Sequence, residues 1–109
     1  MAEASHLAAE FIGIGLSAIA LSDPAIITAL SNDFAYDEVF WRQIRALGHI
    51  GDIAIGISSS GKSDNVNFAL KFAKDIGMVA IDFPRIGKTQ SQIQENQLRL
   101  IHKLYLKFK

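Results

Sequence analysis

The chain has 109 residues, 50% of them hydrophobic, which suits one domain with a real core over residues 1–109. Eleven basic and eleven acidic side chains cancel, so the overall charge favours neither nucleic acid nor an anionic membrane surface as a partner. The absence of cysteine excludes disulfides and thiolate chemistry, and no apolar run reaches the roughly 18 residues of a membrane span. The N-terminus also lacks the basic region followed by an apolar region that is typical of a signal peptide. Together these features predict a soluble protein of the cytoplasm.

Helices dominate the prediction for the first half of the chain. Asp23 and Pro24 form a typical N-cap and first-turn pair, and Gly48 is placed where a helix should end. Apolar spacing supplies the remaining boundaries. The expected elements are a helix over 2–12, a short strand over 16–21, a helix from Pro24 to about Leu30, and a helix over 34–47.

Strands and helices alternate in the second half, with expected strands over 52–58 and 78–83 and expected helices over 63–76 and about 91–108. Isoleucines of the first of these strands alternate with Ala54 and Gly56, so we expect another element to pack closely on its small face. This alternation predicts an α/β fold with a parallel sheet between helices. Three strands are few for such a sheet, so we expect it to be shortened or to be completed by segments outside the printed chain.

The segment GISSSGKS, residues 56–63, lies between a predicted strand and a predicted helix. The string satisfies the P-loop pattern of nucleotide-binding proteins, and Asp82 ends a strand as a magnesium-binding aspartate would. The chain is short for a P-loop NTPase, however, and its serines can equally bind the phosphate of a small molecule at the helix N-terminus. An ordinary turn in which Ser63 only caps the helix is the third possibility.

Titratable and amide side chains at three other places are candidates for a site. His6 and Glu10 are four residues apart on a predicted helix, so they share a face and can meet one metal ion or one substrate. His102 lies among apolar residues of the last predicted helix, where a half-buried structural histidine is the alternative. Asn32 and Asp33 follow a predicted helix, where turn-forming residues are expected in any case.

Several stretches of the chain, taken together, resemble one known family. SHLAAEF, ITALSNDFAYDEVFWRQIRALGHIGDIAIGISSSGKSDNV and QIQENQLRLIH are similar, in this order, to QHFAAEF, TAIANDYGFEEVFSRQVEALG, GDVLIGISTSGNSPNV and RIQEVHLLIIH of the phosphoheptose isomerases. These enzymes are a branch of the sugar isomerase (SIS) fold. The block over residues 27–66 is nearly continuous, which is far more specific than an eight-residue string. The resemblance implies a SIS-type, flavodoxin-like three-layer fold.

The resemblance also implies roles for individual residues. Glu10 matches the family's base and His102 its acid. The implied zinc ligands, for one Zn²⁺ per active site, are His6, Glu10, Gln94 and His102. The implied contacts to the sugar and its phosphate are Asn32, Asp33, Ser58, Ser59, Ser60, Ser63 and Gln94. Lys62 stands where the family commonly has asparagine, so the lysine that completes the P-loop string looks incidental.

The implied reaction converts sedoheptulose 7-phosphate to D-glycero-D-manno-heptose 7-phosphate, for the ADP-heptose of lipopolysaccharide. It needs a base beside the carbonyl, an acid at the neighbouring oxygen and stabilisation of an enediol, which Glu10, His102 and zinc can supply. On a regular helix Gln94 and His102 lie about 12 Å apart along the axis. We therefore expect an active site built across a subunit interface, consistent with the homotetramers of the family.

Parts of the family pattern have no counterpart in the chain: its leading helix, an NGGS loop and a segment before RIQE. If the missing parts are absent from the protein, we expect no activity; if they are only unprinted, we expect an intact site. A non-catalytic SIS paralogue that binds a replication initiator protein is the alternative from another class, although such paralogues lack the set His6, Glu10 and His102. A sugar-phosphate-binding module and a P-loop ATPase are the remaining alternatives.

Overall fold

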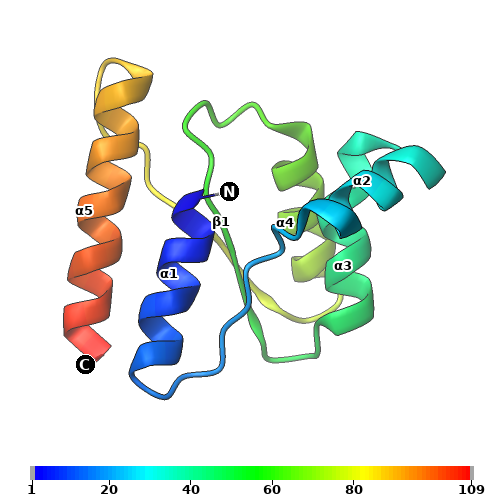
Figure 1. The fold of residues 1–109 in the computed structure, drawn as a ribbon, viewed down its shortest axis with the longest axis horizontal. Coiled ribbons are helices and arrows are strands. Elements are labelled where there is room, and N and C mark those ends of the chain that lie inside the picture. The colour runs from blue at the N-terminus through cyan, green and yellow to red at the C-terminus, as the bar shows by residue number, and fades with distance from the viewer. Residues whose placement is uncertain (1, 109) are drawn as a thin grey trace.

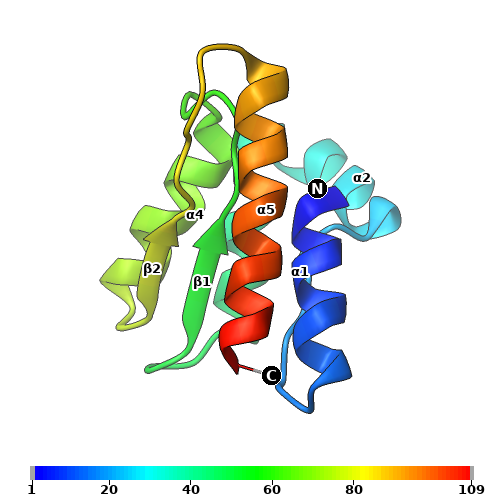
Figure 2. The ribbon, with the colours of Figure 1, turned by 90° about the vertical axis from the view of Figure 1, so that its left-hand side faces the viewer.

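Helices lie on both faces of a small parallel sheet in the computed structural model, which describes residues 2–108 apart from the side chains of Tyr105 and Phe108 (Figures 1 and 2). The elements in chain order are α1 (Ala2–Gly13), α2 (Pro24–Asp33), the 3₁₀ helix η1 (Tyr36–Glu38), α3 (Val39–Leu47), β1 (Ile53–Gly56), α4 (Asp64–Asp75), β2 (Val79–Asp82) and α5 (Gln90–Phe108). None of the described helices is both long and apolar enough to cross a membrane.

The sheet consists of β1 and β2, joined by the crossover helix α4. The strands are parallel, and their register pairs Ile53 with Val79 and Gly56 with Asp82. Both strands therefore end at the same edge of the sheet, and the loops that follow them emerge there side by side (Figure 2). In parallel α/β sheets this edge is where ligand-binding loops gather.

Two apolar clusters, one on each face of the sheet, hold the three layers together. On one face, α1 and α5 meet β1 through Leu7, Ile101 and Ile55. On the other face, α3 and α4 contribute Ile44 and Ala69. This arrangement confirms the predicted α/β class, with a parallel sheet between two helical layers.

The small face of β1 is covered closely by α4, as its alternation of isoleucine with alanine and glycine predicted. A Cβ atom added to Gly56 would lie 2.8 Å from side-chain atoms of both Val66 and Leu70. Only a residue without a side chain allows α4 to approach the strand this closely. The N-terminus of α4 and the loop before it are thereby fixed against the end of β1.

Two predictions about local structure are wrong. Residues 16–21 form no strand but a connection from α1 to α2 (Figure 1). Leu16 and Ile19 in this connection are exposed. A short apolar run becomes a strand only beside a neighbour that pairs with it, and its sequence does not reveal this. The helix expected over 34–47 is interrupted, because extended Ala35 and η1 precede α3.

The cap predicted for α2 is confirmed, since the Asp23 carboxylate accepts hydrogen bonds from the N–H groups of the first turn.

Candidate functional site

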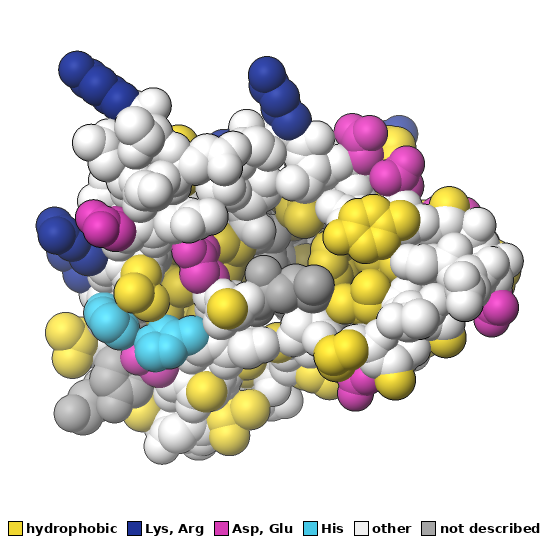
Figure 3. All heavy atoms as spheres, turned by 45° about the horizontal axis from the view of Figure 1, so that its top comes forward, with side chains coloured by type: hydrophobic (Ala, Val, Ile, Leu, Met, Phe, Trp, Pro, Cys, Tyr) yellow, Lys and Arg dark blue, Asp and Glu magenta, His cyan; other side chains and the backbone are white. Residues whose placement is uncertain are grey.

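Three predicted site residues from the two ends of the chain converge. The Oε1 atom of Glu10 lies 2.9 Å from Nε2 of His6 and 3.5 Å from Nε2 of His102. The two Nε2 atoms are 3.2 Å apart. Figure 3 shows histidine side chains next to one another at the surface. This cluster of His6, Glu10 and His102 is called the triad below.

The packing of α1 against α5 explains why the triad forms. His6 and Glu10 are one helical turn apart on α1, so they project from the same face. Leu7 and Ile101 are buried between the two helices and the sheet, and each of them neighbours a histidine of the triad in sequence. Burial of these two aliphatic residues therefore aligns His102 with the pair on α1.

The donor atoms of the triad suit a metal ion. One ligand atom from each of the three residues lies within 4.8 Å of the other two. Three atoms that carry lone pairs are unfavourable at such distances unless a proton or a cation lies between them. Oε2 of Glu10 is buried and has no hydrogen-bond partner among the described residues, so this carboxylate can take a further ligand. Two histidines and one carboxylate are a common set for catalytic zinc, which keeps a position for substrate.

Gln94, the fourth implied ligand, is on the same continuous helix as His102 but eight residues earlier. At the helical rise of 1.5 Å per residue, the two residues are separated by about 12 Å along the axis of α5. The side chain of Gln94 is also exposed. The structure therefore does not place Gln94 with the triad of its own chain.

The serine loop, residues 57–63, follows β1 and leads into α4. Its centre is Ser58, which is buried and whose Oγ accepts a hydrogen bond of 3.1 Å from the N–H of Gly61. The same Oγ lies 3.1 Å from the Ser63 hydroxyl and 3.4 Å from that of Ser60. Ser59, between them, is half-buried. The predicted phosphate-binding serines thus form a compact group at the N-terminus of α4.

Two interpretations of this loop are corrected by its contacts. Ser63 occupies the N-cap position of α4, but its side chain makes no capping hydrogen bond and is directed to Ser58 instead. An ordinary capped turn is therefore excluded. Asp82 offers no free carboxylate for magnesium, because Arg85 donates to both of its oxygens, at 2.8 and 2.7 Å. This pairing removes the second point in favour of an ATPase, which was the Asp82 carboxylate at the end of a strand.

Arg85 also contacts the serine loop. Its Nε lies 2.8 Å from the position that a Cβ atom on Gly61 would occupy, and Gly61 has a φ of +70°, which favours glycine. Hydrogen bonds from Arg85 lower the pKa of the Asp82 carboxyl below its usual value of 3.8. A cationic side chain therefore lies directly beside the loop predicted to bind an anion.

Asn32 and Asp33 lie in the last turn of α2, and both are exposed. Within the described chain, α2 contacts only η1 and α3, whereas the triad is on α1 and α5. Figure 1 shows α2 and α5 at opposite sides of the molecule. One copy of the chain therefore does not bring this pair to its own triad.

Gln97 is a residue that the sequence analysis missed. Its side chain is fully buried, and its Nε2 donates a hydrogen bond of 3.1 Å to the carbonyl of Ser58. The sequence pattern could have identified Gln97 as a buried polar residue. It lies four residues from both Ile93 and Ile101, so its amide interrupts the apolar face of α5.

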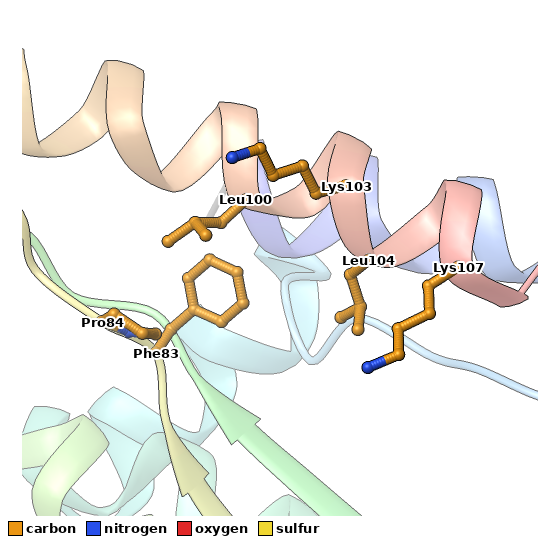
Figure 4. A pocket seen from close by; sticks show the side chains of 6 residues that line it. All are labelled: Phe83, Pro84, Leu100, Lys103, Leu104 and Lys107. Atoms are coloured by element: carbon orange, nitrogen blue, oxygen red, sulfur yellow. The ribbon is translucent and has the colours of Figure 1, made fainter.

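The recess under α5 is separate from these groups (Figure 4). Phe83 and Leu100 face one another in it, and its edge carries two lysines. The complete lining is Phe83, Pro84, Leu100, Lys103, Leu104 and Lys107. No predicted site residue that the structure describes is among them, so this recess is not the candidate site.

The chain is similar to proteins of one family. The family model described as "SIS domain" matches residues 1–83. The phosphoheptose isomerase of Paramagnetospirillum magneticum is 51% identical over 89 residues, which cover 75% of this chain and 46% of that protein. The enzyme of the same name from Synechocystis sp. is 54% identical over 87 residues, covering 73% of this chain and 45% of that protein. The chain thus matches less than half the length of these curated relatives.

Solved structures agree with the sequence matches. Phosphoheptose isomerase GmhA from Neisseria gonorrhoeae has a TM-score of 0.89 and 36% identity, with 98% of this chain and 69% of that chain covered. A phosphoheptose isomerase from Francisella tularensis has a TM-score of 0.87 and 28% identity, with 98% and 68% covered. The chain therefore belongs to the SIS domain family, in the branch formed by the phosphoheptose isomerases.

Proposed function

We propose that the protein interconverts sedoheptulose 7-phosphate and D-glycero-D-manno-heptose 7-phosphate. The observation that carries this proposal is the convergence of His6, Glu10 and His102 from the first and last helices. The names of the relatives support it. A carboxylate and an imidazole in contact with one another are the pair that acid–base isomerisation needs.

Glu10 is proposed as the base and His102 as the acid. Glu10 takes the proton from C1 of the ketose and returns it to C2. His102 transfers the other proton, from O1 to O2. The second oxygen of Glu10 is buried and has no hydrogen-bond partner among the described groups, so no competing hydrogen bond occupies it when the carboxylate holds this proton. The half-buried position of Glu10, with 19% of its side chain exposed, limits competition from water.

His6, Glu10 and His102 are the residues of this chain that would hold one Zn²⁺ ion. When bound, zinc would polarise the neighbouring sugar oxygens as a Lewis acid. Gln94 would complete the ligand set from a second copy of the chain, since it lies about 12 Å from His102 along its own helix. This separation supports an active site shared between subunits of a homotetramer.

The serine loop is proposed to bind the phosphate through Ser58, Ser59, Ser60 and Ser63. The free N–H groups and the positive end of the α4 dipole add to these hydroxyls. Asn32 and Asp33 would contact the sugar of a neighbouring subunit, because they lie on the far side of their own chain. The product would supply ADP-heptose for lipopolysaccharide in the cytoplasm.

The test is to incubate the protein with sedoheptulose 7-phosphate, with and without a chelator, and to follow the aldose by NMR. We expect turnover that the chelator abolishes and added Zn²⁺ restores. The control is sedoheptulose without phosphate, which should not react. A folded oligomer that binds the sugar phosphate but forms no aldose would overturn the proposal.

A further inference from the structure

Gln97 connects the serine loop to the helix that carries His102. It is fully buried on α5, and its amide donates to the carbonyl of Ser58, 39 residues earlier in the chain. Among the described residues, this is the side-chain hydrogen bond that links α5 to the serine loop. The contact is remote in sequence and is shielded from water, which would otherwise compete for both groups.

The residue that Gln97 contacts is the centre of the serine loop. Ser58 is 8% exposed, and its hydroxyl organises the groups around it: the N–H of Gly61 and the hydroxyls of Ser60 and Ser63. A shift of the Ser58 backbone would therefore displace three neighbouring groups at once. The hydrogen bond from Gln97 is directed at that backbone.

Stability explains the donor half of the Gln97 amide, which satisfies the Ser58 carbonyl, but not the acceptor half. Oε1 of Gln97 is buried without a hydrogen-bond partner among the described residues. A buried polar atom without a partner is unfavourable, and an unbranched apolar side chain of the same length would avoid that cost. The donor half of the amide makes the useful contact, and the acceptor half is an energetic disadvantage.

We propose that Gln97 is a positioning residue, which holds the serine loop in the arrangement that binds the substrate phosphate. It fixes the carbonyl of Ser58, so that the hydroxyls of Ser58, Ser60 and Ser63 face a common point. The proposal rests on the proposed function, in which this loop binds the phosphate of the sugar.

The same contact holds the serine loop at a fixed position along α5. His102 follows Gln97 by five residues, or about 7.5 Å along a regular helix. The phosphate of a sugar phosphate and its reacting carbons are at opposite ends of the molecule. By attaching the loop to α5, Gln97 keeps the phosphate-binding groups in a constant position relative to the helix that carries Gln94 and His102.

The experiment compares Gln97→Met with Gln90→Met in the full chain. Methionine matches glutamine in length and lack of branching but cannot donate, and Gln90 is an exposed glutamine on the same helix. Binding of inorganic phosphate and of Zn²⁺ is measured by calorimetry, and the kinetics are measured with sedoheptulose 7-phosphate. Loss of one buried hydrogen bond should weaken phosphate binding roughly tenfold in Gln97→Met. Zinc affinity should stay unchanged, KM should rise and kcat should change little, while Gln90→Met should match the unaltered protein.

Equal phosphate affinity in Gln97→Met and the unaltered protein would overturn the positioning role and leave the proposed function standing. If the unaltered protein binds no phosphate and does not convert sedoheptulose 7-phosphate, the proposed function and the positioning role are both rejected. Should Gln97→Met not fold, Gln97→Leu serves for the same comparison. Failure of both apolar variants to fold would also overturn the proposal, because a structural role would then account for the amide.

Discussion

His6 and His102 are 96 residues apart in the chain, yet their Nε2 atoms lie 3.2 Å from each other. The rings meet edge to face, with their centroids 5.3 Å apart. Neither histidine is buried, so apolar burial of the rings does not explain the contact. Their approach depends on Leu7 and Ile101, which pack α1 and α5 against the same sheet face.

Removal of His102 should abolish tight zinc binding. Residues that only orient metal ligands change affinity 10–100-fold, so loss of a proposed direct ligand in His102→Ala should lower Zn²⁺ affinity by more than about 100-fold. His49→Ala is the matched control, since His49 is an exposed histidine that is paired with Asp52 and does not belong to the triad. Competition with a chromophoric chelator measures both affinities. Equal loss in the two variants would show that zinc binds elsewhere.

Mixing two inactive variants should restore activity if the site is shared between subunits. Asp33→Ala and His102→Ala should each be inactive, because one removes a proposed sugar contact and the other the proposed acid. In randomly mixed oligomers about a quarter of the shared sites would contain neither substitution. Activity is assayed after joint refolding, with each variant refolded alone as the control. A mixture as inactive as its components would place both residues in one subunit's site.

Lys62→Asn should leave phosphate binding within about threefold of the unaltered protein. Lys62 is exposed, and the contact that it makes within the loop is a backbone hydrogen bond of 3.1 Å to the Ser60 hydroxyl, which asparagine can also make. Ser58→Ala is the positive control and should weaken binding roughly tenfold, because the centre of the loop is lost. Calorimetry with inorganic phosphate gives both values. A large loss of phosphate affinity in Lys62→Asn would instead support the interpretation of this segment as a nucleotide-binding P-loop.

The ion pair of Asp82 with Arg85 should appear in the acid titration of the protein. Hydrogen bonds from Arg85 lower the pKa of Asp82 in the folded state. The pair therefore stabilises the fold above the usual aspartate value of 3.8, and this stabilisation is lost as the pH falls through the lowered pKa. NMR titration should find a higher Asp82 midpoint in Arg85→Gln than in the unaltered protein. An unchanged midpoint would mean that the pair does not persist in solution.

Local chemistry made much of the fold predictable. Asp23 and Pro24 marked the start of α2, and the alternation around Ala54 and Gly56 identified the close approach of α4. Leu16 to Leu21 could not be assigned in this way, because the same apolar run serves as a strand or as a connection. The difference lies in which neighbour is present, and that is a property of the assembled structure.

The candidate site was predictable only where a motif carried it. The His6–Glu10 spacing and the serines of residues 58–63 are local patterns, whereas the contact of His102 with His6 and Glu10 depends on how two helices pack. Gln97 was missed for a related reason. A polar residue on an apolar face indicates a buried contact but does not name the partner, here the carbonyl of Ser58.

The mutual hydrogen bonds of the serine loop have a consequence for selectivity. The hydroxyls of Ser58, Ser60 and Ser63 already have partners in one another, so a ligand must replace these bonds to bind. A neutral sugar hydroxyl would exchange one neutral hydrogen bond for another and gain little. A phosphate dianion forms charge-assisted bonds about twice as strong, and it alone gains from the exchange. The loop should therefore select ligands by charge: it should bind phosphorylated sugars and should not bind the same sugars without phosphate.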